Sequence, residues 1–186
     1  APGLGILGVM LAYTPLHHLL LAEPLAPAVL VMTSGNLSDE PICTGNDEAL
    51  TRLRGLADFF LLHNREIVTR VDDSVARVMG GRTRLLRRAR GYSPVPILLQ
   101  RPTRDFLACG AEMKNSFCLV RRGEAYLSQH IGELTGPESL DFYQESIAHL
   151  QNVLEVAPPQ VACDLHPDYL SSRHARALGL PCTGIQ

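Results

Sequence analysis

The 186-residue sequence has no tryptophan and only one lysine, Lys114. Its other sixteen basic side chains are arginines, so contacts to anions must come from guanidinium groups or from backbone N–H groups. The five cysteines are odd in number and form no C-x-x-C pair, which argues against a disulfide framework and against a zinc site. We expect free thiols in a reducing cytoplasm. The net charge of −2 gives no overall attraction to nucleic acid.

The sequence also lacks a hydrophobic run that fits a membrane span. The first 22 residues carry no formal charge, but Pro2, Pro15, His17 and His18 interrupt them, and no basic segment precedes them. We therefore predict neither a membrane-spanning helix nor a signal peptide. The sequence begins without Met, in a stretch typical of the middle of a domain, and we expect a fragment of a longer protein.

The first half of the sequence mixes strand-like and helix-like patterns. A hairpin is predicted over 74–92, with its turn at Gly80–Gly81. Short apolar runs predict strands and helical spacing predicts helices. The strands are expected at 4–13, 27–33 and 59–62, and the helices at 14–23 and 45–57.

Three prolines within 94–102 mark an extended segment, and we place a linker at 98–104 between domains 1–97 and 105–186. The pattern then restarts. The clearest helix begins with capping-box spacing at Thr135 and Glu138. The order resembles the opening of an actin-like ATPase-type domain. Its predicted elements are a strand at 105–112, a hairpin at 115–132, a helix at 135–156, a strand at 159–165, a helix at 166–181 and a strand from 181.

Three polar clusters are candidates for binding sites. The stretch TSGNLS at 33–38 follows a predicted strand, where small residues let backbone N–H groups approach an anion, although a plain turn would use the same residues. In HNREIVTRVDDSVAR at 63–77, two arginines could bind a phosphate, and Asp72 or Asp73 could hold Mg²⁺ or orient an arginine. A solvated, charge-balanced surface is the alternative.

The third cluster has five arginines between Arg82 and Arg90. Such a density points to a nucleic-acid patch. Only Tyr92 lies nearby to stack on a base, and strand alternation would divide the arginines between two faces. The sequence therefore argues against nucleic acid as a partner.

These stretches carry a resemblance to a known family. TSGNLSDEPI, FLLHNREIVTRVDDSVAR and LLRRARGY resemble the C-terminal half of the YrdC-like domain of HypF-type carbamoyltransferases, and LGVMLAYTPLHHLLL is similar to the same region. ACGAEMKNSFCLVRRGEAYLSQHIGEL and VACDLHPDYLSSRHA resemble the first lobe of the family's actin-like (ASKHA) transferase domain. The resemblance covers nearly the whole chain and implies an α/β fold, with the end of the first domain followed by the start of the second.

The resemblance also implies an activity. HypF-type maturation factors of [NiFe] hydrogenases use carbamoyl phosphate and ATP, form a carbamoyl-adenylate in the YrdC-like domain, and pass the carbamoyl group to the C-terminal cysteine of HypE. ATP, Mg²⁺ and a metal ion in the complete second domain are thus implied. The family's zinc-finger modules, the first half of its YrdC-like domain and its His-rich motif are not in these 186 residues. We therefore expect this chain alone to be inactive, with no metal site of its own.

The resemblance assigns roles to particular residues. Ser34, Asn36 and Ser38 would form the catalytic loop around the nucleotide and the carbamoyl group. Asp164 and His166 follow a predicted strand as a possible second site, although helix capping by His166 or Asp168 is an equal alternative. Lys114 faces phosphate by the resemblance, or is an ordinary exposed lysine. The expected nucleotide- and phosphate-binding residues are Thr33, Arg65, Arg70, Ser74, Arg87, Lys114 and Asn115.

Two other functions remain open at this point. An O-carbamoyltransferase of secondary metabolism has similar domains, but there the domain order differs. An RNA-binding or tRNA-modification module would use the Arg82–Arg90 cluster. The presence of both folds in one chain speaks against the tRNA pathway, whose enzymes carry them on separate chains.

Overall fold

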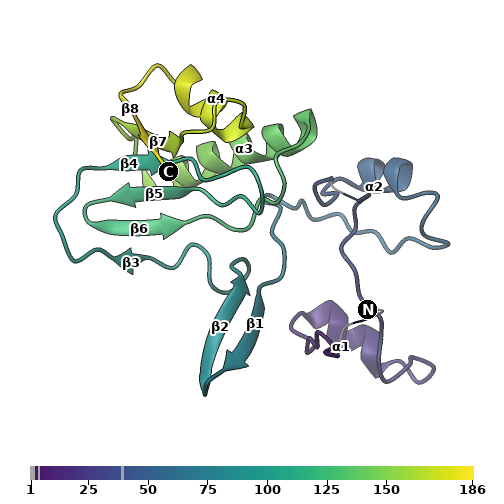
Figure 1. Cartoon of the computed structure of the whole chain (residues 1–186). Helices are drawn as coiled ribbons and strands as arrows, with labels where there is room; N and C mark the ends of the chain where they lie inside the picture. The colour runs from purple at the N-terminus through teal and green to yellow at the C-terminus, as the bar shows by residue number, and fades with distance from the viewer. Residues whose placement is uncertain (1–2, 4, 39) are drawn as a thin grey trace. The chain divides into compact units, whose positions relative to one another are not determined.

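The structure is a computed structural model that describes residue 3, residues 5–38 and residues 40–186. It divides into two compact units, Ala1–Ser34 and Gly35–Gln186. The described part of the first unit contains helix α1 (Pro15–Ala22) (Figure 1). The helix begins as predicted, because Thr14 Oγ1 accepts a hydrogen bond from the His17 N–H at 3.1 Å and Pro15 occupies the first turn.

The strands predicted in the first third of the chain are not formed. No described residue among 5–13, 27–33 and 59–62 lies in a strand, and Leu4 lies outside the described residues. The apolar side chains remain exposed, as at Val9 (87%) and Val31 (102%). An extended apolar segment becomes a strand only when a neighbour pairs with its backbone. Within the described part of the chain these segments have no such neighbour.

The second unit begins with helix α2 (Asn46–Arg52), which is shorter than the predicted 45–57. The predicted hairpin is confirmed as β1 (Val75–Met79) and β2 (Arg82–Arg87). Gly80 and Gly81 form its turn with φ of 57° and 72°. Two consecutive positive φ angles are the signature of a tight hairpin turn, which explains the paired glycines.

A six-stranded sheet forms the centre of the second unit, in the order β3-β6-β5-β4-β7-β8. The first three pairings are antiparallel, and β4–β7 and β7–β8 are parallel. β3 spans the last residue of the predicted first domain, 1–97, and the first residue of the predicted linker, 98–104. The strands are β3 (Ile97–Leu98), β4 (Phe106–Ala108), β5 (Cys118–Arg121), β6 (Glu124–Leu127), β7 (Val161–Asp164) and β8 (Cys182–Ile185).

Helices α3 (Pro137–Leu154) and α4 (Leu170–Ala177) enclose the main core with this sheet (Figure 1). Ile147, Leu150 and Leu154 of α3 are buried in it. The predicted cap of α3 is one residue out of place, since Ser139 Oγ accepts from the Gly136 N–H at 3.2 Å. None of the described helices is long and apolar enough to cross a membrane.

Candidate functional site

The predicted nucleotide loop is divided by the boundary between the two units. Thr33 and Ser34 belong to the first unit, where both are exposed. In the second unit, Asn36 Nδ2 donates hydrogen bonds to the carbonyls of Leu37 at 2.8 Å and Glu40 at 3.0 Å. The Cys43 N–H donates to the Gly35 carbonyl at 2.9 Å and closes the segment. Asn36 therefore holds the shape of the loop, and Ser38 is exposed.

A chain of charged side chains runs from this loop to helix α3. Arg52 pairs with Glu40, and its Nη1 lies 2.5 Å from Glu48 Oε1. Arg70 Nη2 lies 4.0 Å from Glu48 Oε1, and Arg70 Nη1 lies 3.0 Å from Glu145 Oε2. We call these five residues the ion-pair chain. Of these five residues, only Arg70 is among the predicted site residues. The i,i+4 spacing of Glu48 and Arg52 in a predicted helix is a sequence signal for one of the ion pairs.

The electrostatics of the ion-pair chain favour its charged state. Partial burial raises the pKa of Glu48, but hydrogen bonds from the N–H groups of Thr44 and Gly45 and from Arg52 outweigh it and leave that pKa below its ordinary value. The hydrogen bond to Glu40 raises the pKa of Arg52. The Glu48 carboxylate and the Arg52 guanidinium therefore stay ionised and paired at neutral pH.

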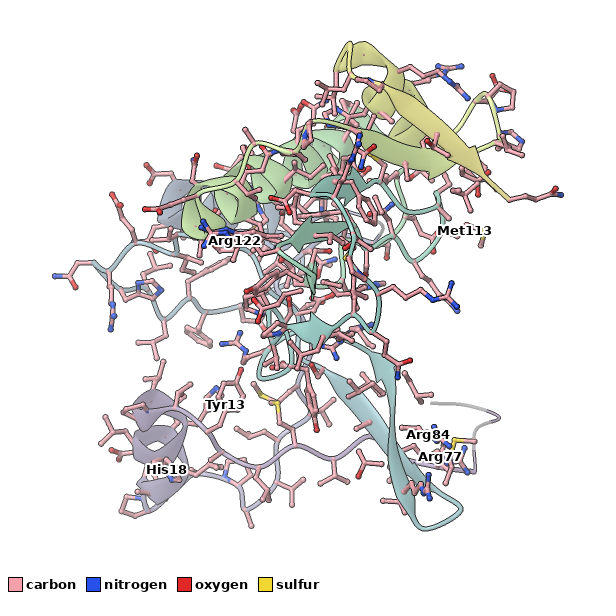
Figure 2. The ribbon with its side chains drawn as sticks, turned by 90° about the vertical axis from the view of Figure 1, so that its left-hand side faces the viewer. Tyr13, His18, Arg77, Arg84, Met113 and Arg122 are labelled. Atoms are coloured by element: carbon pink, nitrogen blue, oxygen red, sulfur yellow. The ribbon has the colours of Figure 1, made fainter. Side chains whose placement is uncertain are left out.

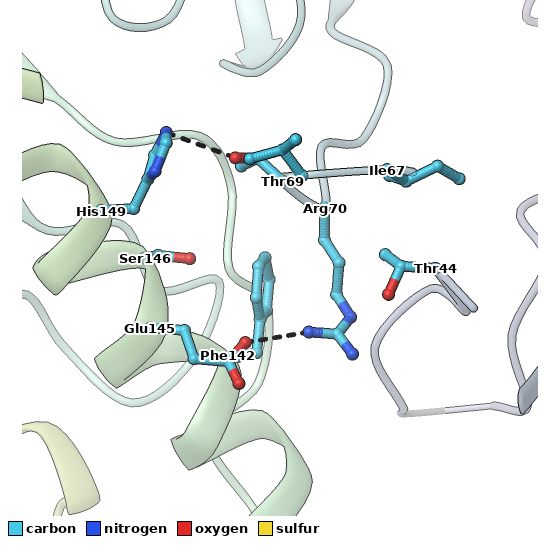
Figure 3. A pocket seen from close by; sticks show the side chains of 9 residues that line it. Thr44, Ile67, Thr69, Arg70, Phe142, Glu145, Ser146 and His149 are labelled. Atoms are coloured by element: carbon cyan, nitrogen blue, oxygen red, sulfur yellow. Dashed lines mark hydrogen bonds and ion pairs between the residues drawn. The ribbon is translucent and has the colours of Figure 1, made fainter. Parts of the chain in front are cut away.

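Arg70 lies beside a cavity of about 250 Å³ (Figure 3). Its Nε donates to the Ile42 carbonyl at 2.9 Å, and its guanidinium carbon lies 5.7 Å from the centre of the Phe142 ring. On the other side, Thr69 Oγ1 lies 3.3 Å from His149 Nε2. The other predicted arginine, Arg65, is exposed. The structure thus does not bring Arg65 and Arg70 together on one anion, because the Arg70 donors are directed at protein groups.

Ser74 and Arg87, both predicted to bind phosphate, lie around the hairpin base. Ser74 Oγ accepts from the Ala89 N–H at 2.8 Å and donates to the Arg90 carbonyl at 2.9 Å. Arg87 Nη1 lies 3.8 Å from Asp72 Oδ2. Arg90 Nε lies 3.3 Å from Asp73 Oδ1. Of the two roles weighed for Asp72 and Asp73, the geometry matches the orientation of arginines rather than the binding of Mg²⁺.

The hairpin itself carries exposed arginines. Arg77 and Arg84 are cross-strand partners, and Figure 2 shows them together on the two strands. Neither strand contains an aromatic residue on which a base could stack. The hairpin therefore carries positive charge but no aromatic side chain for base stacking, and this gives no further support to an RNA-binding function.

The loops after the parallel strands β4 and β7 meet at the carboxyl ends of those strands, where α/β sheets bind ligands. They touch where the Leu170 N–H donates to Glu112 Oε2 at 2.7 Å. Asn115 is buried, and its Nδ2 donates to the carbonyls of Cys109, at 3.1 Å, and Ala111. Its Oδ1 is buried without a partner among the described residues. Lys114 is exposed, and its N–H donates to Glu133 Oε1 at 3.1 Å.

The candidate second site lies in the loop after β7. The His166 N–H donates to Asp164 Oδ1 at 2.8 Å, and the Asp168 N–H donates to His166 Nδ1 at 3.2 Å. The His166 ring stacks on Tyr169 with centroids 4.2 Å apart. Asp164 and His166 are thus neighbours in one local turn, but neither His166 nor Asp168 caps α4, whose N-cap residue Tyr169 makes no side-chain cap hydrogen bond. Among the described residues, no group of three or more His, Cys, Asp or Glu side chains is arranged to hold a metal ion.

Comparison with known proteins matches two successive segments of the chain. The family model of the HypF Kae1-like domain matches residues 101–186, and the Sua5/YciO/YrdC model, described as telomere recombination, matches residues 1–89. Carbamoyltransferase HypF of Synechocystis sp. is 48% identical over 187 residues, covering all of this chain and 24% of that protein. The chain belongs to the HypF family. HypF2 of Cupriavidus necator is 49% identical over 206 residues, covering all of the chain and 25% of that protein.

Solved HypF structures show the same fold. A crystal structure of full-length HypF in the phosphate- and nucleotide-bound form matches with a TM-score of 0.91 at 47% identity, covering 97% of this chain and 24% of that one. The structure of T. kodakarensis HypF matches with a TM-score of 0.79 at 38% identity, covering 83% and 21%. The α/β fold, with YrdC-like and actin-like parts in this order, is therefore confirmed. The chain spans about a quarter of the length of the HypF proteins it matches.

Proposed function

We propose that the chain is part of a HypF carbamoyltransferase that converts carbamoyl phosphate and ATP to a carbamoyl-adenylate and transfers the carbamoyl group to the C-terminal cysteine of HypE. The observation that supports this most directly is the 48% identity to a carbamoyltransferase HypF across the whole chain. That identity extends through both segments, so the chain carries parts of both proposed sites.

The proposed chemistry divides between the two segments. Carbamoyl phosphate must first be hydrolysed to carbamate and inorganic phosphate; in the first segment a carbamate oxygen then attacks the α-phosphorus of ATP, and pyrophosphate leaves. Thr33, Ser34, Asn36 and Ser38 would supply hydroxyl and amide groups around the nucleotide, with Arg65, Ser74 and Arg87 nearby for phosphate. In the second, the acceptor thiolate attacks the carbamoyl carbon and AMP leaves, with Lys114, Asn115, Asp164 and His166 as the candidate residues.

The residues present give little support for a metal ion within this segment. Asp72 and Asp73 lie next to arginines, and the described residues form no metal-binding cluster. Mg²⁺ accompanying ATP would supply charge neutralisation of the phosphates. None of the described residues of this chain is proposed to bind that Mg²⁺.

The test uses the full-length protein. Wild type is expected to exchange labelled pyrophosphate into ATP only when carbamoyl phosphate is present, and to carbamoylate the acceptor cysteine. Ser34→Ala should lower both rates by about 10² to 10³, the range for loss of one donor to a developing charge. Thr103→Ala, an exposed threonine with no assigned role, is the matched control and should be unchanged. Wild-type rates in Ser34→Ala would remove this serine from the site, and no exchange in wild type would refute the function.

A further inference from the structure

The ion-pair chain joins parts of the molecule that are far apart in the sequence. Its charges alternate in sign from Glu40 through Arg52, Glu48 and Arg70 to Glu145. Arg70 and Glu145 are 75 positions apart, with Arg70 in the YrdC-like match and Glu145 in the Kae1-like match. All five residues lie in the second compact unit. The chain of contacts is therefore a physical connection between the two functional segments.

Arg70 is the centre of this connection. Its guanidinium reaches the Ile42 carbonyl, the two carboxylates of Glu48 and Glu145, and the face of Phe142. Its own carbonyl accepts from Gln129 Nε2 at 3.4 Å. Figure 3 shows the Arg70 side chain extended between Thr44 and α3, with its end directed at Glu145. Nε and Nη1 of Arg70 are thus hydrogen-bonded to protein groups, and Nη2 faces the Glu48 carboxylate at 4.0 Å.

The other end of the ion-pair chain reaches the predicted nucleotide loop. Glu40 belongs to that loop, where its carbonyl accepts from Asn36 Nδ2. Glu48 Oε2 accepts from the N–H groups of Thr44, at 2.9 Å, and Gly45, at 3.2 Å, and so fixes the exit of the loop into α2. A displacement of Arg70 would remove both its bond to the Ile42 carbonyl in the loop and its contact with Glu145 on α3.

We propose that Arg70 is a positioning residue that holds the Gly35–Cys43 loop in register with helix α3, and thereby couples adenylation in the first segment to carbamoyl transfer in the second. Arg70 does not touch the substrates. The coupling rests on the proposed function, whereas the holding of the loop does not. Because the pairs are partly exposed, they contribute little to global stability, and their effect is on orientation.

The test of coupling uses Arg70→Gln in the full-length protein. Pyrophosphate exchange should stay within about twofold of wild type, while kcat for carbamoylation of the acceptor falls about tenfold and KM for ATP is unchanged, a change typical of coupling between sites. Arg54→Gln, an exposed arginine next to α2, is the matched control. Glu145→Gln should lower kcat for carbamoylation of the acceptor to a similar extent. The double variant of Arg70→Gln with Glu145→Gln should lower kcat at most about twofold further than Arg70→Gln alone, because both changes break the same ion pair.

The holding of the loop is measured separately by hydrogen exchange, which needs no activity. Arg70→Gln and Glu145→Gln should each speed exchange of the Cys43 amide, which is bonded to Gly35, by about tenfold. Amides of β4 and β7 should be unaffected. Unchanged Cys43 protection would overturn the proposal even in an active enzyme, and loss of pyrophosphate exchange in Arg70→Gln would make Arg70 part of the adenylation site instead. Glu145 is 66% exposed by its side chain, so its variant tests the proposal if Arg70→Gln fails to fold.

Discussion

At the scale of single residues, Gly110 has no room for a side chain. It follows β4 with φ of +71°, a conformation that costs any L-residue energy. A Cβ built there would also press into the Ser116 carbonyl oxygen and lie 3.0 Å from Asn115 Nδ2. Gly123, in the β5–β6 turn, has φ of +83° but nothing within 4 Å of its would-be Cβ. The two glycines share the strained backbone and differ in the space around it.

Gly110→Ala should lower the free energy of unfolding by about 3 kcal/mol, because steric overlap adds to backbone strain. Gly123→Ala should lower it by only about 1 kcal/mol, from strain alone. Urea unfolding of both variants, followed by far-ultraviolet circular dichroism, measures the difference. Equal losses would show that the loop between Gly110 and Asn115 yields to a methyl group.

The same scale shows what sequence reasoning about side chains could reach. The TSGNLS stretch is a candidate because small polar residues follow an apolar run, and the roles that the resemblance implies for Ser34, Asn36 and Ser38 stay predictions. The sequence pattern did not reveal that the Asn36 amide donates to the carbonyls of Leu37 and Glu40. Nor did it reveal that the Ser74 hydroxyl is hydrogen-bonded at the base of the hairpin. A residue's type gives its donors and acceptors, but only the folded neighbours decide whether a ligand or the protein uses them.

At the scale of elements, α3 supplies the largest helical face of the core. Leu150 is 7% exposed and Val153 is 58% exposed, so two apolar residues three positions apart face in different directions. Leu150→Ala should lower the free energy of unfolding by about 3 kcal/mol, from lost transfer energy and the cavity left behind. Val153→Ala should change it by about 0.5 kcal/mol or less. Similar losses from the two variants in urea unfolding would contradict the burial of this face.

Elements were predictable where their partners lie nearby in the sequence. The β5–β6 hairpin lies within the predicted 115–132, and β1–β2 turns at Gly80–Gly81 as predicted, because each strand finds its neighbour within a few residues. The strand expected at 27–33 is not formed, although Val29 and Val31 look equally strand-like. A strand's existence depends on a backbone partner, which periodicity does not reveal.

At the scale of the whole molecule, the connection between segments was the least predictable feature. The ion pair of Arg70 and Glu145 crosses 75 positions, and no local pattern links them. Arg70 was predicted to bind phosphate because it lies among polar residues, while its contacts are with Ile42, Glu145 and Phe142. An ion pair between a helix residue and a distant loop residue produces no periodic pattern in the sequence. Such a pair can therefore be identified only from the folded structure.

The pH dependence of stability tests packing across the second unit. Burial lowers the pKa of His174, where α4 meets α3 and its ring lies edge-on to Tyr143 at 5.4 Å. Burial, followed by the charge of nearby Arg87, lowers the pKa of His130, whose N–H donates to the Arg88 carbonyl. Below the ordinary value of 6.5, the unfolded chain therefore binds protons at these two imidazoles that the folded chain does not.

It follows that the free energy of unfolding should fall as the pH is lowered from 6.5 toward 5, and that unfolding in this range takes up protons, about one or fewer per histidine. His174→Gln should reduce that uptake, and the double variant with His130→Gln should reduce it further. Urea midpoints at half-unit pH steps give the uptake from their slope, and stopping at pH 5 keeps the Glu48 carboxyl, with its lowered pKa, outside the window. A pH profile that keeps its wild-type slope in the double variant would mean that neither ring is shielded from water as packed.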